Sequence, residues 1–73
     1  MRGYPAMDIT MSHVLKFLGH EKRFGFYRFT SYYCNKDETS NNLYWMYKDD
    51  SETTVSYGSL ETVVQFAVDN KLL

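Results

Sequence analysis

The chain has 73 residues, a formal net charge of −1, and aromatic side chains at 18% of its positions. A chain of this length buries only roughly 60% of its unfolded surface, so it predicts one small domain with a core of few, large side chains. Its composition excludes intrinsic disorder, and no apolar run approaches the roughly 20 residues that cross a bilayer. A single cysteine and the absence of an apolar leader predict a cytoplasmic protein without an internal disulfide.

Residues 1–8 contain Gly3 and Pro5 and lack apolar periodicity, which predicts a flexible amino-terminal arm. A single domain is expected over residues 9–73. No repeat, linker or low-complexity tract divides this stretch. We therefore expect the chain to be a monomer with one folded unit.

A first helix is predicted over residues 10–19. Its apolar positions recur at helical spacing and form one apolar stripe, Met11, Val14, Leu15 and Leu18. Thr10 is the expected N-cap, and Gly19 is expected to end the helix in a left-handed conformation. Phe17 lies off this stripe, so it is assigned to a flank or to the surface.

Residues 24–35 are dense in aromatic and β-branched side chains, which predicts one long strand with rings on both of its faces. Two shorter strands are predicted over residues 43–48 and 53–57, with a turn at residues 49–52 between them. Because the connections are short, we expect an antiparallel meander.

The last element is a predicted helix over residues 60–68, with Ser59 as N-cap, Glu61 in the first turn and Lys71 in the last. The order α-β-β-β-α predicts a two-layer α+β domain in which two helices cover one face of a three-stranded antiparallel sheet. The expected core includes Leu15, Leu18, Trp45, Val55, Val64 and Ala67.

The sequence favours a non-enzymatic protein. His13, His20 and Cys34 are the side chains from which a nucleophile and base could be assembled, but no third orienting group accompanies them. One cysteine and two histidines fall short of a structural zinc site, and residues 49–52 match a calcium loop only in composition. We therefore expect no metal, no cofactor and no catalytic residue.

Charge is divided unevenly along the chain. Residues 1–36 carry six Lys or Arg against two acidic residues, whereas residues 37–73 carry two Lys against seven acidic residues. A domain folded from such halves can present one basic face to an anionic partner.

Residues 22–29, Lys-Arg-Phe-Gly-Phe-Tyr-Arg-Phe, are similar to the RNP1 signature of RRM and cold-shock RNA-binding domains. In those families, aromatic rings on a strand stack on bases while flanking Lys and Arg hold phosphates. The resemblance implies a single-stranded nucleic-acid site, formed by Lys22, Arg23, Phe24, Phe26, Tyr27 and Phe29.

In size and architecture, the chain also resembles small bacteriophage-encoded regulators that bind host machinery, such as inhibitors of bacterial RNA polymerase. This resemblance implies a partner protein larger than the chain itself, and it is the first interpretation. The expected partner-binding residues are Arg2, Tyr4, Met7, Lys22, Arg23 and Arg28, from the basic half and its arm. Binding of single-stranded nucleic acid is the alternative, and neither interpretation involves a membrane.

Overall fold

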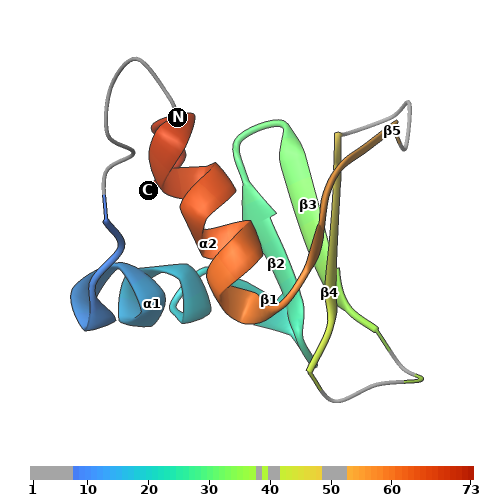
Figure 1. The fold of residues 1–73 in the computed structure, drawn as a ribbon. Helices are drawn as coiled ribbons and strands as arrows, with labels where there is room; N and C mark the ends of the chain where they lie inside the picture. Colours follow the sequence, from blue (N-terminus) through green and yellow to red (C-terminus); the bar gives the residue numbers. More distant parts are fainter. Residues whose placement is uncertain (1–7, 38, 40–41, 49–52) are drawn as a thin grey trace.

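The computed structural model describes residues 8–37, 39, 42–48 and 53–73. Over these residues the chain forms two helices and a five-stranded antiparallel sheet whose strands lie in chain order (Figure 1). Helix α1 spans Met11–Leu18, and helix α2 spans Leu60–Asp69. The strands are β1 (Glu21–Arg23), β2 (Phe26–Phe29), β3 (Tyr32–Lys36), β4 (Tyr44–Lys48) and β5 (Thr53–Gly58). The α+β class and the antiparallel sheet are confirmed, but the prediction of three strands was wrong.

The extra strands arise from two tight turns. The turn between β2 and β3 divides the segment predicted as one strand, and the turn at the start of that segment pairs it with β1, which precedes it. Phe24 and Gly25, with φ of 48° and 79°, form the turn between β1 and β2. Few residues other than glycine adopt the Gly25 conformation without strain, and a Cβ there would lie 3.3 Å from the Cβ of Lys36. The first turn therefore depends on this glycine.

The second turn lies between β2 and β3, and its first residue, Thr30, has a φ of 48°. Only two residues separate Phe29 from Tyr32, and Phe29 pairs with Tyr32 across the hairpin. Paired residues point to the same face of a sheet, so every side chain of β3 points to the face opposite the one expected for a continuous strand. This inversion decides which rings are buried.

The core lies between the helices and one face of the sheet. Helix α2 packs over β4 and β5 and also contacts α1 (Figure 1). The Phe17 ring of α1 lies 4.6 Å from the Phe29 ring and 5.2 Å from the Tyr27 ring, measured between centroids. Among the residues that the structure describes, the buried ones are Phe17, Tyr27, Phe29, Cys34, Tyr44, Met46, Val63, Val64 and Ala67.

Helix α1 forms where it was predicted, but it buries a different face. Thr10 caps it through a capping box with His13, as expected of its N-cap position. Phe17, assigned to a flank or to the surface, is fully buried, whereas Leu15 is 62% exposed, which contradicts its assignment to the core. Turning the helix toward Phe17 buries a larger apolar area than turning it toward Leu15, because a phenyl ring is the larger group. Gly19 ends the helix with a right-handed φ of −69°, not in the predicted left-handed conformation.

Helix α2 agrees more closely with the prediction. Ser59 is its N-cap, and Glu61 lies in its first turn. Lys71 lies beyond the C-cap Asn70 rather than in the last turn. Val64 and Ala67 are fully buried as expected.

Of the other predicted core residues, two pack against the core and one does not. Leu18 and Val55 are half-buried and pack against the core. The prediction for Trp45 was wrong: it lies on the face of β4 opposite Met46 and is 40% exposed.

Some predictions concern residues that the structure does not describe. These are the amino-terminal arm over residues 1–7, with Arg2, Tyr4 and Met7, and the turn at residues 49–52. Of the helices in the described part of the chain, neither has the length and apolar character needed to cross a bilayer.

Candidate functional site: the open face of the sheet

The helices cover one face of the sheet, and no described element forms a layer over the other (Figure 1). We call this second face the open face. It is defined by the side chains that alternate with the buried ones along the strands and follow the register of the sheet: Arg23, Phe26, Arg28, Tyr33, Asn35, Trp45, Tyr47, Thr54 and Tyr57.

These side chains form two parallel rows that cross the strands. The first row runs over all five strands in the order Arg23, Phe26, Asn35, Trp45, Tyr57. The second row runs from β2 to β5 in the order Arg28, Tyr33, Tyr47, Thr54. Each row therefore starts with an arginine at the β1–β2 side and continues through aromatic rings.

The rings of the two rows contact one another. Between centroids, Tyr33 lies 5.4 Å from Phe26 and 5.8 Å from Tyr47, and Tyr47 lies 5.3 Å from Trp45. The guanidinium carbon of Arg28 lies 5.5 Å from the centre of the Tyr33 ring, within the range of a cation–π contact. Four rings and one arginine thus form a continuous surface rather than isolated exposed groups.

Hydrogen bonds hold two members of this surface in place. The Nε1–H of Trp45 donates to Oγ1 of Thr54 at 2.9 Å, and the Nδ2–H of Asn35 donates to the hydroxyl oxygen of Tyr47 at 3.5 Å. Because the polar ends of these side chains are held by the sheet, their rings lose little further freedom when they meet a ligand.

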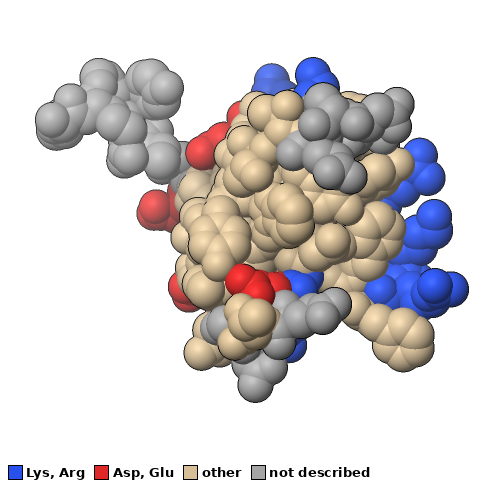
Figure 2. Space-filling view, turned by 90° about the vertical axis from the view of Figure 1, so that its right-hand side faces the viewer, with Lys and Arg blue, Asp and Glu red and all other residues tan. Residues whose placement is uncertain are grey.

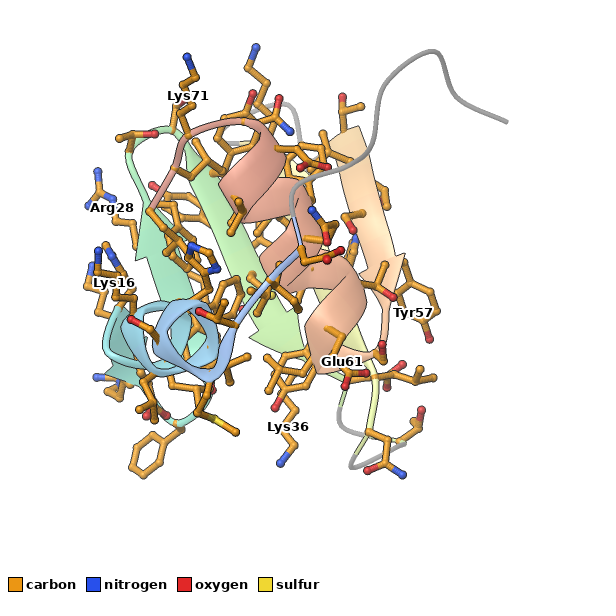
Figure 3. The ribbon with its side chains drawn as sticks, turned by 60° about the vertical axis from the view of Figure 1, so that its left-hand side comes forward. Lys16, Arg28, Lys36, Tyr57, Glu61 and Lys71 are labelled. Atoms are coloured by element: carbon orange, nitrogen blue, oxygen red, sulfur yellow. The ribbon has the colours of Figure 1, made fainter. Side chains whose placement is uncertain are left out.

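The charges around the open face are segregated. Seen from the sheet side, Lys and Arg gather along one edge of the molecule, and Asp and Glu lie mostly toward the opposite edge (Figure 2). Lys16 and Arg28 project on one side, whereas Tyr57 and Glu61 lie on the other (Figure 3). The two rows contain no acidic residue among the positions that the structure describes.

Asp37 is an acidic residue in contact with the first row. The Tyr57 hydroxyl donates to its carboxylate at 2.8 Å. Hydrogen bonds from the hydroxyl and backbone N–H of Thr39, and then from Tyr57, lower the pKa of Asp37, and the carboxylate in turn raises the pKa of Tyr57. Asp37 therefore carries its negative charge at neutral pH, at the β5 end of the face.

The structure separates the residues of the RNP1-like segment. Lys22, Arg23 and Phe24 are exposed, and Phe26 is half-buried on the open face. Tyr27 and Phe29 are buried in the core at 5% and 1% exposure, so their assignment to a nucleic-acid site was wrong. The physical reason is the alternation of side chains along β2, which points Tyr27 and Phe29 toward the helices and Phe26 toward the open face.

Four aromatic members of the open face were missed by the sequence analysis: Tyr33, Trp45, Tyr47 and Tyr57. The signal was present in β4, where Tyr44 and Met46 alternate with Trp45 and Tyr47. Alternation identifies two faces of a strand, but it does not identify the face that the helices cover.

The residues considered for catalysis lie elsewhere. Burial raises the pKa of the Cys34 thiol to about 12, which leaves it protonated and unreactive at neutral pH. His13 takes part in the capping box of α1, and the His20 ring lies 4.6 Å from the Phe29 ring. Among the described residues, no group of three or more His, Cys, Asp or Glu is placed to hold a metal ion.

Comparison of the chain with protein-family models, with curated proteins and with solved structures finds no match. The function is therefore argued from the open face.

Proposed function

We propose that this protein binds single-stranded nucleic acid on the open face of its sheet and catalyses no reaction. The observation that carries the proposal is the pair of cross-strand rows, in which two arginines lead into five aromatic side chains on an uncovered face. The proposal takes up the alternative interpretation of the sequence, with a different set of rings.

Aromatic side chains on an open sheet suit unpaired bases because every base has a flat π-face. Each base that stacks on a protein ring contributes about 1–3 kcal/mol to binding, with little dependence on sequence. Tyr57 and Trp45 are 52% and 40% exposed, so their rings are available for such contacts. Arg23 and Arg28 are placed to hold phosphates at the edge where both rows begin.

A protein partner ranked first from sequence because of the size and architecture of the chain and its basic amino-terminal half. Nucleic-acid binding gains support because five aromatic side chains lie together on the open face. The sequence pI of about 6.0 still excludes a protein that coats nucleic acid through overall positive charge. Affinity must then come from stacking and from a few local phosphate contacts.

The direct test is fluorescence anisotropy with labelled oligothymidine and oligouridine of about ten nucleotides, a length within the usual range of single-strand sites. Trp45→Ala should weaken binding by about 1–3 kcal/mol because it removes one stacking surface. Leu15→Ala is the matched control, since Leu15 is 62% exposed but lies on α1 in the helix layer. Failure of the parent protein to bind either oligonucleotide would overturn the proposal.

Salt dependence tests the arginines separately. For single strands, the logarithm of the binding constant falls with the logarithm of salt concentration by about 0.7 for each phosphate contact. Two contacts from Arg23 and Arg28 predict a slope of about −1.4, and Arg28→Ala should reduce it to about −0.7. Lys16→Ala, which removes a charge from α1, should leave the slope unchanged.

A larger protein partner, such as a bacterial RNA polymerase, is the second candidate. The observation in its favour is that the open face carries Tyr, Trp and Arg, the side chains enriched at interface hot spots. An acidic protein surface would meet the same arginines. Affinity capture from a bacterial lysate with and without nuclease separates the two candidates: a host protein retained after nuclease treatment, and lost with Trp45→Ala, supports the protein partner.

A further inference from the structure

Phe24 combines two unusual properties. Its side chain is 95% exposed, and its φ of 48° is a left-handed conformation that few bulky residues adopt. In a two-residue hairpin turn of this kind, the favoured residue before glycine is asparagine. A phenyl ring here contributes no buried area to the core and occupies a position where another residue would fit the backbone better.

The ring borders a hollow on the surface. Lys22, Arg23, Phe24 and Phe26 line this hollow, which we call the turn hollow. Arg23 and Phe26 also begin the first row of the open face, so the hollow adjoins the β1 end of that row. The carboxylate of Glu21, the nearest acid along the chain, accepts a hydrogen bond from the Gly25 N–H.

The turn hollow therefore offers two cations and two aromatic rings in one place, next to a row of further rings. A nucleotide has the matching chemistry: a flat base and an anionic phosphate. Strained backbone positions persist where the surrounding structure or the function requires the residue. Here the core does not require Phe24, because its ring is almost fully exposed.

We infer that the turn hollow is a nucleotide subsite at one end of the single-strand path, in which a base stacks on Phe24 and a phosphate is bound by Lys22 and Arg23. This inference rests on the proposed function of the open face. Its distinctive consequence is that Phe24 serves binding at the expense of stability.

The test is Phe24→Asn, which creates the favoured Asn-Gly turn and removes the ring. Its melting temperature should equal or exceed that of the parent chain, because asparagine tolerates the left-handed conformation. Its affinity for oligothymidine should fall by about 5- to 150-fold, the loss of one stacked base. Phe24→Tyr keeps an aromatic ring and should bind like the parent.

The outcomes separate this inference from the proposed function. If Phe24→Asn binds oligothymidine as tightly as the parent while Trp45→Ala binds more weakly, the turn hollow is not a subsite and the open face remains the site. If Phe24→Asn has a lower melting temperature, the ring has a structural role and the inference fails. The inference is supported if Phe24→Asn is as stable as the parent but binds oligothymidine more weakly, while Phe24→Tyr binds like the parent.

Discussion

The two faces of the sheet are both rich in aromatic side chains, but they meet different surroundings. On the inner face, Tyr27, Phe29 and Tyr44 lie beneath the helices and are at most 8% exposed. On the open face, rings of the same types lie in two rows beside arginines, with Trp45 and Tyr57 substantially exposed. The difference teaches that aromatic content alone does not locate the core of a small domain. The position of each ring along its strand, and the face that the helices cover, decide its role.

The sharpest mutational comparison uses two phenylalanines of β2. Phe29 is 1% exposed and contacts Phe17 and His20, whereas Phe26 lies on the open face and contacts Tyr33. Phe29→Ala should lower the free energy of unfolding by about 3–5 kcal/mol, as expected for a large core residue. Phe26→Ala should cost clearly less, and the measurement is equilibrium denaturation of both variants.

The same pair tests the assignment of the faces through binding. Phe26→Ala should weaken oligonucleotide binding while the chain stays folded, because the ring belongs to the first row. Equal losses of stability in the two variants would show that the open face is a second core surface, and would contradict the account.

The inner face also predicts a loss of stability at high pH. Burial raises the pKa of Cys34 from 9.0 to about 12, and burial, followed by the nearby Tyr44 and Glu21, raises the pKa of Tyr27 from 10.0 to about 12. Both groups are neutral in the folded state, so their contribution is complete below about pH 9 and is lost as pH rises toward 12. The thiol alone accounts for about 1.4 kcal/mol per pH unit within this window.

Cys34→Ala isolates that contribution. Relative to its own stability at pH 7, this variant should lose stability more gradually than the parent between pH 9 and pH 11, measured by urea denaturation. Identical pH profiles for the two chains would show that the thiol is not buried as described.

Local signals in the sequence predicted the helices well and the sheet less well. Thr10 and Ser59 cap the two helices as expected, because a capping hydroxyl acts within one turn of its own position. The turn at Thr30 was missed because threonine rarely takes a positive φ and neither central residue is glycine or asparagine. Because this turn was missed, every side chain of β3 was expected on the wrong face of the sheet. One local error therefore changed the predicted composition of both faces.

The candidate site could be predicted only in part for a related reason. Arg23, Arg28 and Phe26 were singled out because they lie within eight consecutive residues that resemble a known signature. Trp45 and Tyr57 join them through the register of β4 and β5, and such pairing depends on contacts between residues far apart in the chain. Tyr27 and Phe29 share the same signature but face the helices, a distinction that residue type does not carry.

The most direct test of the central claim is an NMR titration of the isotopically labelled chain with oligothymidine. Trp45 is the only tryptophan, so its indole N–H gives a single side-chain signal on the open face. The account predicts that this signal and the backbone amides of β3 and β4 shift upon binding, while those of Val63 and Val64 in α2 stay in place. Binding that shifts the helix signals and leaves the Trp45 indole unchanged would contradict it.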